Sequence, residues 1–453
     1  MRLISPADYI FLALEGREQP FHVGGLQLFT PPEGSGPEFA RELYQRVMET
    51  PDVAPRFRQR LGSVSPTPQR LTWRDDTDID LDYHVQLSAL PRPGRIRELL
   101  EMTSRWHSTL LDRHRPLWEM HIVEGLEDGR VAVYTKMHHA LADGVTALRL
   151  LQNSLSSDPD ETGLTPIFAP RKRRHRASRA TPNPLSQLFD GVSETAGLLP
   201  AAARIGRQIA RERDIPRPMT APKTMFNTSV GGARRFAAQS WEIARIKNVA
   251  KSMGCTLNDV VLAMCGGALR AYLEEQNALP DAPLVAFVPI SLHGKKDNEK
   301  APGNSIGLAL ANLGTDTADP AARLSAVRKS MGQAKQMMSG LTPAQAMAVS
   351  ATMLAPSAAA NLTGTTGLIR PTFNVIISNV PGPRETLYWD GARLDGIYPA
   401  SIVMNGAALN ITLTSNAHTL DFGITGCRTA VPHLQRLLGH LDVALKELEN
   451  VAT

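Results

Sequence analysis

Short stretches in which apolar and polar residues alternate recur along the first third of the chain, and this period of two predicts strands. Between these stretches, apolar residues recur at every third or fourth position, which predicts helices. Strands are expected at residues 26–29, 83–87, 119–124 and 131–134, and helices from Ser5, at 38–48, at 95–111 and after residue 144. Strands and helices that follow one another in this way indicate a mixed α/β fold.

The second part of the chain, from residue 226, shows the same mixture of patterns. Asn258 precedes an apolar run and is expected to cap a helix there. Strands are expected at 234–241, 283–290, 307–312, 373–378, 387–389, 392–398 and 409–415, and helices at 244–253, 259–273, 321–338 and 432–448. We therefore predict an α/β (α+β two-layer sandwich) fold, with an N-terminal domain at 1–155, a linker at 156–225 and a C-terminal domain at 226–453.

The linker differs from its neighbours in charge. Between Arg171 and Lys223 there are 12 Lys and Arg against 4 Asp and Glu, so this stretch carries +8 although the whole chain carries only +5. Helical spacing of apolar residues within 185–209 predicts basic amphipathic helices, which favours a membrane or lipid-droplet surface as the partner of residues 171–213. A solvated linker with one core-packing helix is the alternative. Nucleic acid is not expected as a partner, because no binding fold or aromatic interleaving accompanies the basic residues.

Composition places the chain among globular proteins. It has 453 residues, of which 42% are hydrophobic, so a large core is possible. Three widely spaced cysteines predict no disulfide framework. Acidic residues interrupt the first apolar run, and the uncharged stretch 336–369 contains prolines and glycines, so neither a secretory signal nor a membrane-spanning helix is predicted. We expect a cytoplasmic protein that associates peripherally with the inner membrane or with lipid inclusions.

The candidate chemistry lies where the strand at 131–134 ends. His138 and His139 are adjacent there, and neighbours on a strand point to opposite faces, so only one of them can face a given cavity. Imidazole is the side chain best suited to accept a proton near neutral pH. Asp143 follows on the turn, where its carboxylate can fix a histidine tautomer or brace the loop through an arginine, and Gly144 allows unusual backbone conformations. A metal site is not expected, because the adjacent histidines splay apart and no cysteine is close in sequence.

The motif HHALADG at residues 138–144 resembles the HHxxxDG motif of CoA-dependent acyltransferases, which include chloramphenicol acetyltransferase and peptide-synthetase condensation domains. Further blocks resemble the bacterial bifunctional wax ester synthase/diacylglycerol acyltransferase family. These blocks are HVGGLQLF at 22–29, LPRPGRIRELL at 90–100, LDRHRPLWE at 111–119, LNDVVLA at 257–263 and SNVPGPRE at 378–385. The resemblance covers nearly the whole chain except residues 155–225. It implies two chloramphenicol acetyltransferase-like domains with the active site at their interface.

The resemblance also implies a reaction and roles for the motif residues. The reaction is transfer of a long-chain acyl group from acyl-CoA to a fatty alcohol or a diacylglycerol. His139 would be the general base, His138 would shape the site, Asp143 would hold the loop and Gly144 would give room for the pantetheine arm or the turn. A thioester is already activated, so no acyl-enzyme is required, and acyl-CoA is a substrate rather than a cofactor.

Other residues of the family blocks are candidates for supporting roles. Asn258, Ser378 and Asn379 are polar residues that could stabilise the oxyanion or shape the site. Ala360, within the small-residue stretch 355–367, and Met404 are candidates for an acyl tunnel, because small side chains leave space and methionine adapts to an alkyl chain. Ordinary helix capping, turn formation and close packing are the alternative interpretations of these residues.

Two other functions stay open from the sequence. One is a condensation-type acyltransferase that forms amide bonds, and the other is a non-catalytic protein that binds lipid surfaces. The intact HHxxxDG motif argues against the second. Chain-length preference, the ratio of wax ester to triacylglycerol, the residues that bind the CoA phosphates, the arginine partner of Asp143 and the oligomeric state do not follow from the sequence.

Overall fold

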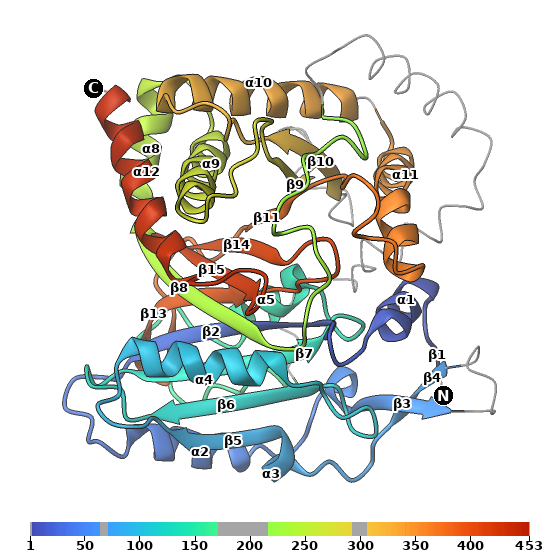
Figure 1. Cartoon of the computed structure of the whole chain (residues 1–453). Coiled ribbons are helices and arrows are strands. Elements are labelled where there is room, and N and C mark those ends of the chain that lie inside the picture. The colour runs from blue at the N-terminus through green and yellow to red at the C-terminus, as the bar shows by residue number, and fades with distance from the viewer. Residues whose placement is uncertain (1, 64–70, 171–215, 292–305, 340, 453) are drawn as a thin grey trace.

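The computed structural model describes residues 2–63, 71–170, 216–291, 306–339 and 341–452. Two six-stranded sheets form two units that lie one above the other in Figure 1. The predicted membrane-binding segment 171–213 falls outside the described residues. The fold class predicted from the sequence, a mixed α/β sandwich, is confirmed by this arrangement.

The N-terminal unit is built on a mostly antiparallel sheet of order β12-β13-β2-β7-β6-β5, in which only β5 and β6 are parallel. The histidine strand β7 lies between β2 and β6 and is buried along its whole length. A small sheet of order β1-β4-β3 stands beside it. The elements are β1 (Arg2–Leu3), α1 (Pro6–Leu14), β2 (His22–Thr30), α2 (Phe39–Met48), the 3₁₀ turn η1 (Pro55–Arg58), β3 (Gln59–Ser63), β4 (Leu71–Asp75), α3 (Leu81–His84), β5 (Val85–Ala89), α4 (Ile96–Ser108), β6 (Trp118–Glu124), β7 (Val131–His138) and α5 (Gly144–Asn153).

The C-terminal unit is built on a mixed sheet of order β10-β9-β11-β14-β15-β8, with β11 parallel to both of its neighbours. Helices α8, α9, α10 and α12 gather above this sheet in Figure 1. The elements are β8 (Arg234–Glu242), α8 (Ile243–Ser252), α9 (Leu257–Glu275), β9 (Val285–Ser291), β10 (Ile306–Asn312), α10 (Pro320–Met338), α11 (Pro343–Leu362), β11 (Val375–Val380), β14 (Leu409–Asn416), β15 (Thr419–Cys427) and α12 (Arg436–Ala452).

One hairpin of the second half crosses to the first sheet. Strands β12 (Tyr388–Trp389) and β13 (Ala392–Ala400) leave the C-terminal unit, and β13 pairs antiparallel with β2. The sheets therefore do not follow the chain order, since residues of the predicted domain 226–453 complete the N-terminal sheet. The boundaries at 155 and 225 remain a prediction, but the two halves of the chain are joined by hydrogen bonds within the N-terminal sheet.

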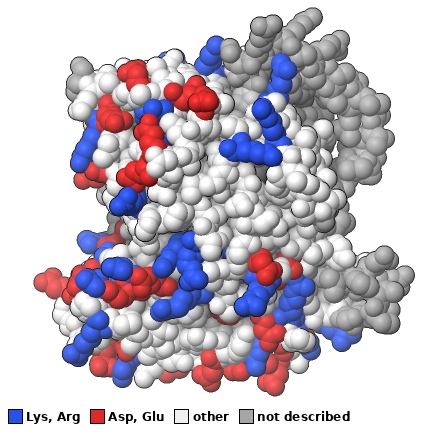
Figure 2. All heavy atoms as spheres, in the orientation of Figure 1, with Lys and Arg blue, Asp and Glu red and all other residues white. Residues whose placement is uncertain are grey.

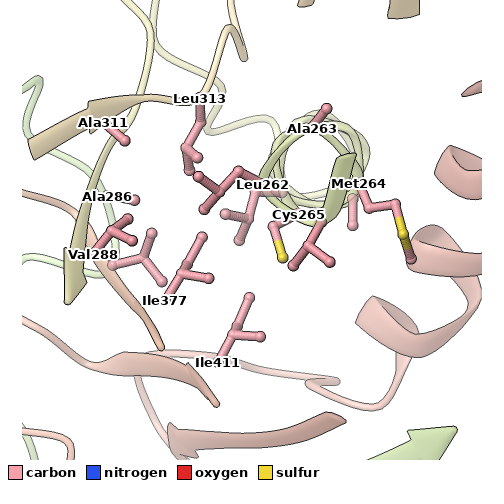
Figure 3. Close-up of a cluster of buried hydrophobic side chains, with 14 of the residues drawn as sticks. Leu262, Ala263, Met264, Cys265, Ala286, Val288, Ala311, Leu313, Ile377 and Ile411 are labelled. Carbon is pink, nitrogen blue, oxygen red and sulfur yellow. The ribbon is translucent and has the colours of Figure 1, made fainter. Parts of the chain in front are cut away.

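Helix α9 is the central helix of the larger core. Its residues from Val260 to Leu269 are buried, and Figure 3 shows Leu262 and Cys265 pointing toward Ile377 and Ile411 of the sheet. Burial of apolar surface on this scale is the dominant favourable term in folding. This core fixes β11, which reaches the apolar cluster of the first unit through Val380.

Several elements differ from those predicted. Strands β3, β4 and β15 and helix α11 were not predicted, and residues 83 and 84 end the short helix α3 rather than begin a strand. The cap prediction for Asn258 is wrong: Thr256 is the N-cap of α9, its hydroxyl accepts the Asp259 N–H at 3.2 Å, and Asp259 completes a capping box. A cap three residues before an acidic residue is the better signal, because both side chains then satisfy free N–H groups.

The surface of the described residues carries mixed charge. Figure 2 shows Lys and Arg interspersed with Asp and Glu on the face in view, rather than one continuous positive field. Among the helices that the structure describes, none by itself is long and apolar enough to cross a membrane. Of the neighbouring helix pairs in the described ranges, α8 and α9 taken together reach that length and composition, and they are bent by 103°.

Candidate active site

The two motif histidines are held by backbone hydrogen bonds on both sides. His138 is the last residue of β7 and pairs with His22 of β2, and its N–H donates to the Leu117 carbonyl at 2.9 Å. The next N–H, that of His139, donates to the Phe21 carbonyl at 2.9 Å. The end of the strand is therefore fixed between β2 and the segment that precedes β6.

The ring of His138 is buried and its orientation is fixed. Its Nδ1 accepts a hydrogen bond from the Ala140 N–H at 3.0 Å, so Nδ1 carries no proton and Nε2 does. Nε2 lies 3.3 Å from Oε1 of Glu15. Nε2 is buried against Glu15 but makes no hydrogen bond of acceptable geometry, and because the side chain is fully buried, His138 is not available to a substrate.

The ring of His139 has a different environment. It is half-buried and stacks on Phe11 of α1, with ring centroids 4.2 Å apart and the planes at 28°. Nδ1 is a buried atom without a hydrogen-bond partner of acceptable geometry, whereas Nε2 is not enclosed in this way. The pKa of His139 is lowered to about 4: burial is the largest cause, the Asp143 carboxylate opposes it, the neighbouring His138 adds to the lowering, and the backbone of His139 itself raises the pKa.

Asp143 and Gly144 form the start of α5. The Asp143 carboxylate accepts the Thr146 N–H at 2.7 Å and is the N-cap of the helix. Within the described part of the chain it forms no ion pair with an arginine, and it does not bind Nδ1 of His139. The expectation of an unusual backbone at Gly144 is wrong, because its φ lies outside the left-handed region; a Cβ there would meet no protein atom within 4 Å.

A buried carboxylate that the motif did not reveal lies behind the histidine pair. Glu15, just after α1, accepts the Phe21 N–H at 3.2 Å through Oε1. Through Oε2 it accepts Nε and Nη2 of Arg113 at 3.1 and 3.0 Å. Burial raises the pKa of Glu15, but His138, the Phe21 N–H and Arg113 together hold it below its usual value. A signal was present in the sequence only as an acidic residue interrupting an apolar helix.

The oxyanion candidates are not all on one side of the sheet. Val375 and Ile377 face the C-terminal core, so Asn379 faces the helices by alternation, while Ser378 and Val380 face the N-terminal unit. Ser378 and Asn379 therefore cannot both reach one site from β11. Asn258, in the first turn of α9, is half-buried. Their catalytic roles stay predictions.

The tunnel candidates lie where α11 meets the N-terminal unit. Ala360 is buried near the end of α11, and Met404 packs against apolar clusters of both units. Beside them, the side-chain oxygen Oε1 of Gln19 accepts the Asn405 backbone N–H at 2.9 Å and Nδ2 of Asn361 at 3.4 Å. Residues of both halves of the chain thus meet at this point, near α1.

A charged side chain of the histidine strand itself is also buried. Lys136 of β7 is fully buried, forms an ion pair with Glu119 at 2.9 Å, and donates to the carbonyls of Trp106 and Thr109, each at 3.1 Å. These bonds connect β7 to the end of α4. Among the residues that the structure describes, no three His, Cys, Asp or Glu side chains are grouped as metal ligands.

The structure has two units, each built on a six-stranded sheet, and a histidine pair lies at a strand end beside the junction of the units. These features define the class of the fold. The first condensation domain of the CDA synthetase has the same fold, with a TM-score of 0.55 over 99% of this chain and 95% of that domain at 15% identity. This likeness gives the class of the fold, which is that of condensation domains.

The comparisons narrow this class to one family. Residues 4–261 match the wax ester synthase/diacylglycerol acyltransferase catalytic domain, and residues 302–449 match the WS/DGAT C-terminal domain. The chain belongs to the wax ester synthase/diacylglycerol acyltransferase family, and the prediction of an O-acyltransferase is confirmed.

Individual relatives agree over the full length. A putative diacylglycerol O-acyltransferase of Mycobacterium bovis is 51% identical over 99% of both chains, and the O-acyltransferase WSD of Acinetobacter baylyi is 42% identical over 100% of this chain and 98% of that protein. The wax ester synthase/diacylglycerol acyltransferase of Marinobacter aquaeolei has a similar structure, with a TM-score of 0.79 and 42% identity over 99% of each chain.

Proposed function

We propose that the protein transfers a long-chain acyl group from acyl-CoA to the hydroxyl of a fatty alcohol or a diacylglycerol, with His139 as general base. The observation that carries this proposal is the asymmetry of the His139 ring. Nδ1 is enclosed without a hydrogen-bond partner, whereas Nε2 is not enclosed in this way, so we assign the lone pair that accepts the proton to Nε2.

The steps follow from this placement. Nε2 takes the proton of the acceptor hydroxyl as the oxygen attacks the thioester carbonyl, and a C–O bond forms. The tetrahedral intermediate carries its charge on the former carbonyl oxygen, and Ser378, on the face toward the N-terminal unit, is the better placed of the β11 candidates to donate to it. The C–S bond then breaks, and the CoA thiolate takes the proton back from Nε2. No side chain is acylated.

Asp143 acts by charge rather than by a hydrogen bond to the ring. Its carboxylate raises the pKa of His139, so it stabilises the imidazolium that forms in the transition state. Its bond to the Thr146 N–H keeps it at this position. The open space around Gly144 is consistent with room for the pantetheine arm, and Ala360 and Met404 are the proposed lining for an alkyl chain.

The pH dependence of turnover should report the low pKa of the base. With a pKa near 4, His139 is neutral throughout the physiological range, so kcat/KM should be constant between about pH 6 and 8 and fall only as pH approaches 4. Asp143→Asn removes a carboxylate that raises this pKa, so the acid limb should move to lower pH and the plateau should drop. A wild-type limb centred at 6.5, or a limb that Asp143→Asn moves upward, would contradict the assignment.

We also propose that residues 171–213 attach the enzyme to anionic lipid surfaces. The support is their sequence, because basic residues and apolar residues at helical spacing occur together there. Deletion of 171–213 should reduce sedimentation with anionic liposomes several-fold, and more so at low salt, since electrostatic attraction is screened by ions. Equal sedimentation of the deletion variant and the full chain would remove this proposal.

A panel of acceptors tests the substrate class. Palmitoyl-CoA with hexadecanol or with a diacylglycerol should release CoA and form the ester. An amine acceptor, with or without a pantetheinylated carrier, should give no amide above the level of a reaction without enzyme. Amide formation at a rate similar to ester formation would instead favour the condensation-type reaction.

A further inference from the structure

Glu15 connects three segments that together hold the histidine pair. Oε1 binds the N–H of Phe21, whose carbonyl in turn binds the His139 N–H, and the same oxygen lies 3.3 Å from His138 Nε2. The side chain of Glu15 is 2% exposed. One carboxylate oxygen therefore contacts one motif histidine directly and the other through a single residue, Phe21.

The other oxygen of Glu15 is occupied by Arg113. The guanidinium binds it through Nε and Nη2, and Nη2 also donates to the Leu12 carbonyl at 2.7 Å. Both donors of the guanidinium therefore meet Oε2, and Oε1 is the oxygen that faces Phe21 and His138. Phe11 and Leu12 lie on α1, and Glu15 is the C-cap of this helix. Phe11 stacks on the ring of His139.

We propose that Glu15 and Arg113 are positioning residues for the reaction. They hold the backbone of His139 through Phe21, keep α1 in the place from which Phe11 stacks on the His139 ring, and set the surroundings of His138 Nε2. This inference rests on the proposed role of His139. Neither residue contacts the reacting atoms. The pair acts on catalysis because a displacement of about 1 Å at the base lowers the rate on the order of 10²-fold.

Position 15 requires a side chain in which both terminal atoms accept hydrogen bonds, one from Arg113 and the other from the Phe21 N–H. In Glu15→Gln one oxygen is replaced by an NH₂ group, which is a donor. If the amide oxygen faces Phe21 and His138, the NH₂ group meets the guanidinium of Arg113, and two donors oppose each other. If the amide is rotated, the NH₂ group meets the Phe21 N–H and the His138 Nε2–H instead. Either rotamer breaks the arrangement in the wild-type protein.

This conflict predicts a rescue. In Glu15→Gln/Arg113→Met the guanidinium is gone, so the amide oxygen can accept from Phe21 and His138 while its NH₂ group is free to donate to the Leu12 carbonyl. If turnover depends on this arrangement, kcat of the double variant should be higher than kcat of Glu15→Gln. If Glu15→Gln acts only by lowering the stability of the fold, the double variant should be still less stable and less active, because Arg113 also holds the end of α1.

The experiment compares kcat and KM for palmitoyl-CoA and hexadecanol in four variants, with thermal melting measured on each. Glu15→Gln should lower kcat roughly 10- to 10²-fold with little change in KM. The double variant should recover about tenfold over Glu15→Gln, as expected for coupled neighbours. Glu124→Gln is the matched control, because Glu124 also binds an arginine, Arg41, through Nε and Nη2 at 3.2 and 3.3 Å, and it should keep the wild-type rate.

His139→Ala, the fourth variant, separates the two proposals. If His139→Ala loses activity but Glu15→Gln does not, the positioning role is wrong and the base assignment stands. If Glu15→Gln loses activity and the double variant is equally slow or slower, Glu15 is only a structural residue and the inference is wrong. If His139→Ala keeps its activity, the proposed function itself fails.

Discussion

Replacing His139 by alanine should lower kcat/KM for palmitoyl-CoA and hexadecanol by about 10²–10⁴-fold, the usual contribution of a positioned general base. The accessible Nε2 is then missing, and the neighbouring imidazole of His138 cannot substitute for it, since its Nδ1 accepts the Ala140 N–H and its Nε2 is buried against Glu15. The binding of acyl-CoA should change little, because the ring acts on the acceptor proton. The measurement is initial CoA release at saturating and limiting substrate.

The control for this variant is His114→Ala. The side chain of His114 is 95% exposed, and its ring pairs only with Asp112 at the surface. It should keep the wild-type rate, which shows that losing a histidine from the N-terminal unit is not by itself harmful. Turnover by His139→Ala within a few-fold of wild type would reject the base assignment.

Replacing Trp118 by alanine should cost about 3–5 kcal/mol in free energy of unfolding, as large-to-small changes of buried aromatics do. Trp118 is fully buried, stacks on His84 and Phe168 with ring centroids 4.4 and 4.9 Å apart, and donates from Nε1 to the Phe57 carbonyl at 2.8 Å. It also pairs with Met137 of the histidine strand. Urea titration monitored by circular dichroism measures the change.

Two further variants calibrate the Trp118 result. Trp118→Phe keeps an aromatic ring but leaves the buried Phe57 carbonyl without its donor, so it should cost about 1–3 kcal/mol. Val443→Ala changes an apolar residue that is 53% exposed on α12 and should stay within about 0.5 kcal/mol of wild type. Equal stability of Trp118→Ala and Val443→Ala would show that this contact is not a stabilising one.

The sequence predicts well those helices and strands whose apolar residues recur with a regular period. The long helices α4 and α10 and the strands β8 and β10 lie within a few residues of their predicted ranges, because hydrophobic period is a local property. The histidine pair at a strand end, the helix after Asp143 and the family also follow from residues that are adjacent in the chain. Short-range signals are sufficient for these elements.

Other features depend on contacts between distant residues, and the sequence pattern does not contain them. Strand β13 joins the first sheet through pairing with β2, more than 360 residues earlier in the chain. Helix α11 was missed because its small and polar residues have no clear apolar face, and Pro356 lies inside it. Glu15 was not identified because its partners, Phe21, Arg113 and His138, come together only in the folded chain.

The direct transfer to the acceptor, with His139 as the only group that handles the proton, is tested most directly by transient kinetics with radiolabelled palmitoyl-CoA. Without an alcohol, the wild-type enzyme should release no burst of CoA and should carry no label. After hexadecanol is added, CoA and wax ester should appear at equal rates, and His139→Ala should form neither at a comparable rate. A burst of CoA equal to the enzyme concentration without acceptor, or ester formation by His139→Ala at the wild-type rate, would contradict this mechanism.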